Sequence, residues 1–401
     1  MSQFQVNGDQ LLVNGHPLDL LQHWAGQTPF YAYDRSVITQ KIRYLRQTLP
    51  SDLKLHYAVK ANPMPALVGF MQQQVDGLDV ASGNELLVAL NAGTDGHQVS
   101  FAGPGKRPRE LKMAVAAQVT INVESFSELE HLCLISDQIG VRARVAIRVN
   151  PDFELKSSGM KMGGGPQQFG IDAEQVPLAL AKIAEYGLHY RGLHIFTGSQ
   201  NLNAESIMTA HRGIFDLAAR LQQSAKSAIE TLNIGGGLGI PYFPGEQVIE
   251  LTAIGEQLDT LMQDFKQQHE ATEIAMELGR YLVGDAGLYV CKVIDIKQSR
   301  GTRFVVVDGG LHHQLAASGN FGQVIRKNYP VAVGNKMQQS ALEPVQIVGP
   351  LCTPLDLLAN RLDLPSIEQG DLIVIYQSGA YGYSASPRDF LSHPQPVELL
   401  V

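Results

Sequence analysis

The sequence predicts an α/β protein in which a (β/α)₈ barrel is joined to an antiparallel β domain. From about residue 53, short β-type runs alternate with helical stretches, and eight such runs occur within roughly 220 residues, the size of a closed barrel. After about residue 287 the β-type runs continue without long helices between them. The chain has 401 residues and is 44% hydrophobic, which supplies enough apolar side chains for a large core.

Each of the eight runs of the predicted barrel ends in small or polar residues. The runs are LKLHYAVK, DGLDVAS, QVSFAG, VTINVES, ARVAIRVNP, GLHIFTGS, TLNIGGG and TEIAMELG. Segments between them, such as ELLVALNAG, place apolar residues at helical spacing. Ser82 with Glu85, and Ser125 with Glu128, have the spacing of a capping box at a helix start. Strands alternating with helices favour a parallel sheet.

The β domain is predicted from both ends of the chain. LYVCKVIDIKQSRGTRFVVVDGG is typical of a hairpin with Arg-Gly near its turn, and the first 25 residues contain two Asn-Gly turns between β-type runs. We therefore expect a barrel over residues 27–275 and a β domain built from residues 1–26 and 276–401. Residues 154–168, rich in Gly and Ser, are interpreted either as a plain linker or as a lid over the barrel mouth.

Composition excludes several classes of protein. The net charge of −8 argues against nucleic-acid binding, which normally needs a basic face. We find no signal peptide and no apolar run long enough to span a membrane. The three cysteines are scattered without a CxxC pair, so no metal site and no disulfide framework are expected. A cytoplasmic enzyme is the expectation.

Polar residues at the carboxyl ends of barrel strands are the catalytic candidates in such a fold. The sequence places there Lys60, Asp79, Arg148, Asn150, His194, Ser199, Gly235, Gly236, Gly237, Glu277 and Arg280.

Three glycines in NIGGGLGIPY stand where the seventh strand turns toward a helix. Glycine there allows backbone N–H groups to close on an anion, and the loops after strands seven and eight form the usual phosphate site of such barrels. A tight turn without a ligand is the alternative. A dinucleotide fingerprint is disfavoured because Ile240 stands where GxGxxG needs its last glycine.

Lys60 in KLHYAVKANPMP is either a surface lysine at a strand end or a lysine that forms an imine. Its combination with a phosphate-binding glycine run and the carboxylate of Glu277 favours the imine. Pyridoxal phosphate needs an amine for its aldehyde, a cradle for its phosphate and an acid facing its pyridine nitrogen. The protonated ring stabilises a carbanion at Cα, which suits decarboxylation.

Seven ordered motifs carry a family resemblance: YAVKAN, GLDVASGNEL, HIFTGSQ, NIGGGLG, ELGRYLVG, GPLCTPLD and GAYGYSASPRDFLSHP. With them the chain resembles the fold-type III pyridoxal-phosphate decarboxylases, the family of diaminopimelate and ornithine decarboxylases, and is most similar to the exosortase-associated branch. The resemblance implies an alanine racemase-like fold and a homodimer with shared active sites. It also implies α-decarboxylation of an amino acid or a carrier-tethered aminoacyl group through a Schiff base and a quinonoid carbanion.

The resemblance also implies residue roles. Lys60 is the Schiff-base lysine, Glu277 faces the pyridine nitrogen, and Cys352 protonates the carbanion from the other subunit. Arg280 contacts phosphate or the substrate carboxylate. The other expected cofactor-binding residues are Asp79, His194, Phe196, Ser199, Gly235, Gly236, Gly237 and Tyr381.

Three departures from the family pattern concern the cofactor ring and the substrate. Phe196 stands where the family has a ring-stacking histidine, and the histidine is at position 194. Thr353 replaces the acid that reads a distal amine in the relatives. The substrate arginine of diaminopimelate enzymes is missing from its usual place, which leaves Arg326 as a displaced candidate. With Arg280 and Asp356, Thr353 and Arg326 make up the predicted substrate site.

Three other functions stay open at this point. The chain could be a diaminopimelate decarboxylase of lysine biosynthesis, an amino-acid racemase or a non-enzymatic pyridoxal-phosphate-binding protein. Racemases of this fold place an arginine against the pyridine nitrogen, so Glu277 argues for decarboxylation. Non-enzymatic carriers resemble the barrel alone, so a β domain bearing Cys352 and Tyr381 argues against them.

Overall fold

The computed structural model describes residues 3–153, 160–161, 163–340 and 343–401. The chain divides into two compact units. Ile42–Ile240 and Val248–Gly279 form one unit, called the barrel here, and Met1–Lys41, Pro241–Gln247 and Arg280–Val401 form the other, called the β domain. Of the segment interpreted as a linker or lid, residues 154–168, residues 154–159 and 162 lie outside the described residues.

The barrel contains the eight predicted strands, all parallel, and β15 pairs with β5 to close the ring. The strands are β5 (Lys54–Ala58), β6 (Gly77–Val80), β7 (Val99–Phe101), β8 (Thr120–Val123), β9 (Arg144–Asn150), β12 (His189–Ile195), β14 (Thr231–Gly236) and β15 (Glu273–Leu278). A short strand, β11 (Ile171–Asp172), adds to the edge of β9, and β10 (Met160–Lys161) pairs with β13 (Gly198–Ser199). The predicted fold class is confirmed.

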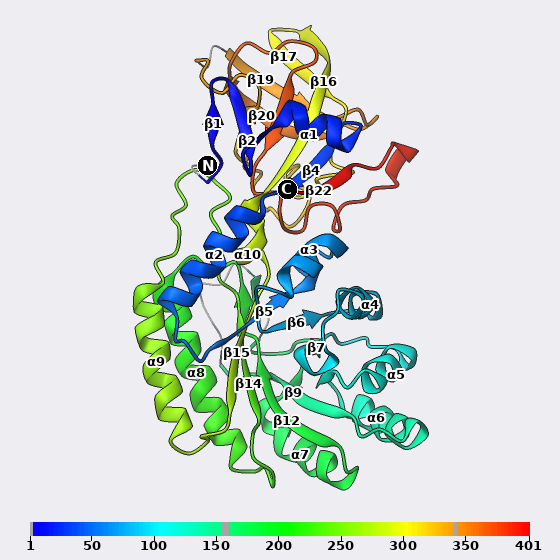
Figure 1. The fold of residues 1–401 in the computed structure, drawn as a ribbon, viewed down its shortest axis with the longest axis vertical. Helices are drawn as coiled ribbons and strands as arrows, with labels where there is room; N and C mark the ends of the chain where they lie inside the picture. Colours follow the sequence, from blue (N-terminus) through cyan, green and yellow to red (C-terminus); the bar gives the residue numbers. More distant parts are fainter. Residues whose placement is uncertain (1–2, 154–159, 162, 341–342) are drawn as a thin grey trace. The chain divides into compact units, whose positions relative to one another are not determined.

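Helices lie outside the ring of strands (Figure 1). They are α3 (Pro65–Met71), α4 (Gly83–Asn91), α5 (Pro108–Ala116), α6 (Phe126–Ile139), α7 (Val176–Glu185), α8 (Ala204–Gln222) and α9 (Thr252–Lys266), and α2 (Arg35–Thr48) precedes β5. The two predicted helix starts are confirmed. Ser82 Oγ accepts the Glu85 N–H at 3.2 Å, and Ser125 Oγ accepts the Glu128 N–H at 3.2 Å. Each cap satisfies a backbone donor that the first turn leaves without a helical partner.

The β domain is built on a mixed sheet. Its strands are β18 (Val331–Val333), β21 (Leu372–Ile375), β16 (Gly287–Ser299), β17 (Thr302–Val307), β19 (Glu343–Val348) and β20 (Leu357–Leu364). In addition, β4 (Phe30–Tyr33) pairs with β16, and β22 (Val397–Leu400) pairs with β4. Most pairings are antiparallel as predicted, but β17–β19 and β22–β4 are parallel. The predicted hairpin is present, because β16 and β17 turn at Arg300 and Gly301, both with positive φ.

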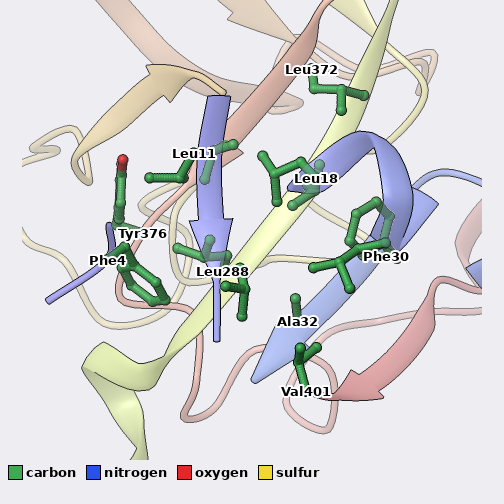
Figure 2. Packing of buried hydrophobic residues seen from close by; sticks show 13 residues of the cluster. Phe4, Leu11, Leu18, Phe30, Ala32, Leu288, Leu372, Tyr376 and Val401 are labelled. Carbon is green, nitrogen blue, oxygen red and sulfur yellow. The ribbon is translucent and has the colours of Figure 1, made fainter. Parts of the chain in front are cut away.

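The first residues of the chain belong to this β domain. They form β1 (Val6–Asn7), β2 (Gln10–Val13), β3 (His16–Pro17) and α1 (Leu18–Ala25), and α10 (Arg280–Val283) leads into β16. Figure 2 shows Phe4, Leu11 and Leu18 packed with Leu288 and Leu372 in one buried cluster. Each large apolar side chain buried there contributes about 1.5–3 kcal/mol, so the amino-terminal segment is held by packing as well as by pairing.

Candidate active site

Lys60 follows the carboxyl end of β5, in a single 3₁₀ turn over Val59–Ala61. Its side chain is exposed, and Nζ lies 5.6 Å from the centroid of the Phe196 ring. Val59 and Ala61 on either side are buried, which fixes the backbone at this strand tip. The amine therefore stands on a rigid support beside an aromatic face.

Glu277 lies on β15, the neighbour of β5, and its side chain is buried. Its Oε2 lies 3.4 Å from His194 Nε2 and 3.4 Å from Asn233 Nδ2. Burial alone favours the protonated acid, but the His194 ring, Lys60 and Arg148 together outweigh it and hold the pKa of Glu277 well below its usual range. Glu277 is thus a fixed negative charge near Lys60.

His194 is 1% exposed, its Nε2 faces Glu277, and its Nδ1 makes no hydrogen bond to any residue that the structure describes. It lies in register with Arg148 on β9 and with Asn233 on β14. A buried ring nitrogen with no hydrogen-bond partner is costly. This cost marks the space around His194 and Glu277 as a place where a further polar group fits.

Gly235, Gly236 and Gly237 lie at the end of β14, where the neighbouring backbone leaves no room for a side chain. A Cβ at Gly236 would lie 1.8 Å from the Glu277 carbonyl oxygen, and one at Gly237 would lie 2.2 Å from the Gly198 carbonyl oxygen. Gly235 and Gly237 also have positive φ, at 68° and 89°, which favours glycine. The run therefore brings bare backbone beside Ser199, which is half-buried on β13.

Asp79 on β6 anchors a polar network inside the barrel. One of its oxygens accepts a hydrogen bond from Ser100 Oγ and lies 3.4 Å from His56 Nδ1, and Asn122 donates to Ser100 Oγ at 3.3 Å. Burial acts against the charged His56 ring, but Asp79 reverses this effect and the pKa of His56 is raised. The other Asp79 oxygen, Oδ2, is buried without a partner in the described part of the chain.

Two further rim residues are engaged within the barrel. Arg148 Nη1 makes a buried ion pair with Glu124 at 3.0 Å, and Asn150 Nδ2 donates to Asp172 at 2.8 Å. These contacts tie the end of β9 to Glu124, which follows β8, and to β11.

Arg280 belongs to the β domain, where tyrosines surround it. Its Nη1 donates to Tyr242 Oη at 2.9 Å, and its guanidinium lies 4.7 Å from the centroid of the Tyr381 ring. Tyr329 packs against Tyr242 with 5.0 Å between the ring centroids and 43° between the ring planes. Burial disfavours the charge on Arg280, but the two tyrosine hydroxyls outweigh it and its pKa is raised. Its Nε is buried without a partner in the described residues, so the guanidinium keeps donor capacity.

Cys352 lies in an exposed loop of the β domain between β19 and β20. Thr353 follows it, half-buried, with its Oγ1 accepting the Leu355 N–H at 3.3 Å. Asp356 closes the loop. One of its oxygens accepts the Leu311 N–H at 2.6 Å, and the other accepts the Leu351 N–H at 2.9 Å. Burial raises the pKa of Asp356, although these backbone donors act in the opposite direction. Both of its oxygens are used to shape the loop.

Arg326 is held against the same loop region. Its Nη2 donates to the Leu357 carbonyl oxygen, and burial lowers its pKa. Thus the predicted residues fall into two groups. Lys60, Asp79, His194, Phe196, Ser199, Gly235, Gly236, Gly237 and Glu277 gather in the barrel, whereas Arg280, Arg326, Cys352, Thr353, Asp356 and Tyr381 belong to the β domain.

Sequence reasoning missed four residues of these networks. Tyr242 and Tyr329 surround Arg280, and His56 and Asn233 hold Asp79 and Glu277. Two of these residues could have been found from the sequence. Tyr242 ends the motif NIGGGLGIPY, and His56 is a polar residue two positions from Ala58 within an otherwise apolar strand.

Comparison with known proteins places this geometry in a family. The family model described as "Pyridoxal-dependent decarboxylase, pyridoxal binding domain" matches residues 35–284. The chain belongs to the pyridoxal-dependent decarboxylases.

Relatives cover nearly the whole of this decarboxylase. It is 37% identical to the L-glutamyl-[BtrI acyl-carrier protein] decarboxylase of Niallia circulans, over 93% of this chain and 89% of that protein. It is 31% identical to the diaminopimelate decarboxylase of Aquifex aeolicus, over 98% of this chain and 90% of that protein. The crystal structure of the diaminopimelate decarboxylase from M. jannaschii matches with a TM-score of 0.89 and 26% identity, over 100% of this chain and 92% of that one.

The predicted family, fold, enzyme class and cofactor are therefore confirmed: this is a pyridoxal-phosphate-dependent carboxy-lyase with the alanine racemase-like fold. The exosortase-associated branch stays a prediction. No helix in the described part of the chain is long and apolar enough to cross a membrane.

The residues present in the barrel fit pyridoxal phosphate. An amine stands at Lys60, an ionised buried acid at Glu277, and a glycine cradle that no other residue can replace at Gly235–Gly237. His194 Nδ1 and Asp79 Oδ2, which are buried without a hydrogen-bond partner among the described residues, lie in the same barrel. This donor set matches the aldehyde, pyridine nitrogen and phosphate of the cofactor.

Proposed function

We propose that this decarboxylase removes the α-carboxylate of an aminoacyl group with a neutral or acidic side chain, with L-glutamyl carried on an acyl-carrier protein as the first candidate. The observation that carries this proposal is the absence of a free carboxylate among residues 349–356, the loop that bears Cys352. Thr353 offers only a hydroxyl, and Asp356 already accepts two backbone N–H groups.

This loop offers no negative charge to a substrate with a basic side chain. A distal ammonium facing the Thr353 hydroxyl would lose water without gaining an opposite charge, which is unfavourable. A substrate with a neutral or acidic side chain, or with a thioester, needs no negative charge next to Thr353 and carries no such penalty. The similarity to a decarboxylase named for an L-glutamyl carrier-protein substrate supports the same conclusion.

Within the barrel, each residue has a distinct proposed role. When bound, pyridoxal phosphate supplies an electron sink for the carbanion that decarboxylation leaves at Cα. Lys60 holds the cofactor aldehyde, and Glu277 keeps a proton on the pyridine nitrogen. Asn233 and His194 orient the Glu277 carboxylate, since both lie 3.4 Å from Oε2.

The remaining barrel residues position the cofactor. Gly235–Gly237 and Ser199 bind the phosphate through backbone N–H groups and a hydroxyl. Phe196 stacks on the ring in place of the histidine that related enzymes use. Asp79 on β6, whose position is fixed by contacts with Ser100 and His56, contributes a carboxylate to the proposed cofactor site.

The β-domain residues act on phosphate and substrate. Arg280 and Tyr381 contribute to the phosphate or the substrate carboxylate, and Arg326 is available to an acidic side chain. Cys352 returns a proton to Cα from the partner subunit of a homodimer. Its exposure in a loop supports this role, because a thiol that serves another subunit has to be accessible.

Carbon dioxide release from the purified holoenzyme tests the proposal. We would compare kcat/KM for L-glutamyl-carrier protein, L-glutamate, L-ornithine and meso-diaminopimelate. We expect L-glutamyl-carrier protein or L-glutamate to exceed both basic substrates by at least about tenfold, equivalent to about 1.4 kcal/mol. Diaminopimelate decarboxylation is the second candidate, supported by 31% identity to the Aquifex aeolicus enzyme. Efficient turnover of meso-diaminopimelate would replace our proposal with that function.

A further inference from the structure

A cavity of about 480 Å³ opens at the end of the barrel opposite to Lys60. It is lined by the first residues of five strands, namely Lys54, Thr120, Arg144, Thr231 and Glu273. Barrels of this kind are normally filled by bulky branched side chains. Here the lining also includes small or polar residues such as Ser100, Asn122 and Ala146, which leave space inside.

Arg144 is the decisive residue of this cavity. It is only 6% exposed, and within the described chain no carboxylate lies within ion-pair distance of it. Its Nη1 donates to the Gln118 carbonyl oxygen at 3.3 Å, but its Nε is buried without a partner there. Burial, followed by repulsion from Arg191, lowers the pKa of Arg144, and attraction from Asp95 offsets only part of this effect. A buried guanidinium without an ion-pair partner is costly.

Arg191 lies beside Arg144 and adds a second donor. Its Nη1 pairs with Glu230 and its Nη2 donates to Thr231 Oγ1 at 3.3 Å, but its Nε is also buried without a partner in the described residues. The Lys54 ammonium on β5 lines the same cavity and is half-buried.

Two acids also line the cavity and have to be weighed. Asp76 accepts the Leu55 N–H at 2.7 Å and pairs with Arg46 at 2.6 Å, so its charge is already compensated. Glu273 favours the charge on Arg191 but is exposed. The buried part of the lining therefore keeps an excess of positive charge and N–H donors.

We propose that this cavity binds a small oxyanion, either a carboxylate or a phosphate, between Arg144 and Arg191, with Lys54 adding a third positive charge. Oxyanions bind guanidinium groups through short charge-assisted hydrogen bonds, often to Nε and one Nη together. Such a ligand would accept hydrogen bonds from the two unpartnered Nε groups and give Arg144 an ion-pair partner. The site does not depend on the proposed substrate. Its mouth lies at the amino-terminal ends of the strands, and its deep wall includes His56 and Asn233, which contact Asp79 and Glu277.

Isothermal titration calorimetry tests the site. The holoenzyme is first reduced with borohydride, so that the cofactor phosphate keeps its own site filled. Inorganic phosphate and succinate are then titrated separately at an ionic strength held constant with sodium chloride. We expect saturable binding of at least one of the two anions. Binding of phosphate alone, succinate alone or both supports the site, and the tighter anion identifies the ligand class.

Three variants locate the binding. Arg144→Gln should weaken binding at least tenfold, and Lys54→Gln provides a second, milder variant should Arg144→Gln fail to fold. Arg142→Gln removes the same charge from an exposed position two residues away, outside the cavity lining, and should bind like the wild type. Wild-type protein without saturable binding of either anion would overturn the proposal. The proposal would also be overturned if the two single variants, Lys54→Gln and Arg144→Gln, both bound the anion as tightly as the wild type. If Arg144→Gln does not fold, undiminished binding in Lys54→Gln alone would overturn it.

Discussion

The barrel and the β domain hold their polar residues in different ways. In the barrel, Glu277, Asp79 and His194 are buried, and their neighbours come from adjacent strands of a closed ring. In the β domain, Cys352 and Thr353 lie on an exposed loop whose shape depends on two hydrogen bonds to Asp356.

This difference indicates how the family can keep one chemistry and change its substrate. A residue on a closed ring of strands cannot change without disturbing its neighbours, so the barrel fixes the groups that serve the cofactor. A loop residue such as Thr353 can change with little effect on the fold. We therefore expect barrel substitutions to abolish catalysis and loop substitutions to redirect it.

Lys60→Ala should give the largest effect. Without its amine, the chain should retain no pyridoxyl group after borohydride reduction, and carbon dioxide release should fall to background. Peptide mass mapping of the reduced protein measures this. Lys112→Ala, on the exposed face of α5, is the matched control and should still carry the label. A wild-type label that maps to another lysine would contradict the assignment.

Glu277→Gln should be the next largest effect. The amide has nearly the same shape but no negative charge, so it cannot keep a proton on the pyridine nitrogen. We expect kcat to fall by about two to three orders of magnitude, as is typical when one preorganised electrostatic contact is lost. Glu277→Asp keeps the charge and should recover part of the rate. Equal rates for the glutamine variant and the wild type would mean that another group protonates the ring.

Thr353→Asp should redirect substrate choice rather than abolish activity. A carboxylate on this loop would pair with a distal ammonium, and a partly buried pair of about 1.4 kcal/mol corresponds to roughly tenfold. The ratio of kcat/KM for L-ornithine to that for L-glutamate should rise by this factor. Thr353→Asn, which adds an amide without charge, should leave the ratio unchanged. A similar rise in both variants would show that charge is not the cause.

His56→Gln should give the smallest effect, and its size should depend on pH. Asp79 raises the pKa of His56 in the folded chain above its value in the unfolded chain. The pair therefore stabilises the fold fully below the unfolded value and loses this contribution as pH rises through the folded value. We expect the Tm of the variant to lie about 1–3 °C below that of the wild type near pH 5.5, and the gap to close at alkaline pH.

Differential scanning calorimetry across pH measures this gap. His131→Gln, at an exposed position of α6, is the control and should show no such trend. A gap that widens with rising pH would contradict the direction of the linkage.

The barrel was predictable because its signals are local. Each strand is an apolar run that ends in glycine or a polar residue, and Ser82 and Ser125 mark helix starts through contacts within four residues. The parallel pairing of β17 with β19 was not predictable, because it joins segments separated by a long connection without a repeating pattern.

The polar networks were only partly predictable for the same reason. Lys60 and Glu277 stand at strand ends and carry a family motif. By contrast, the hydrogen bond from Arg280 to Tyr242 and the contact of Tyr242 with Tyr329 join segments that are distant in sequence. No pattern in the sequence indicates that the oxygens of Asp356 accept backbone N–H groups from Leu351 nearby and from Leu311, 45 residues earlier.

The central claim is that one active site needs Lys60 of one chain and Cys352 of another. Mixing an inactive Lys60→Ala protein with an inactive Cys352→Ala protein tests it most directly. In a homodimer with random exchange, about half of the dimers are hybrids and each has one complete site, so activity should return to about a quarter of the wild-type value. A mixture that stays inactive, although subunit exchange is confirmed by mass spectrometry, would contradict the claim.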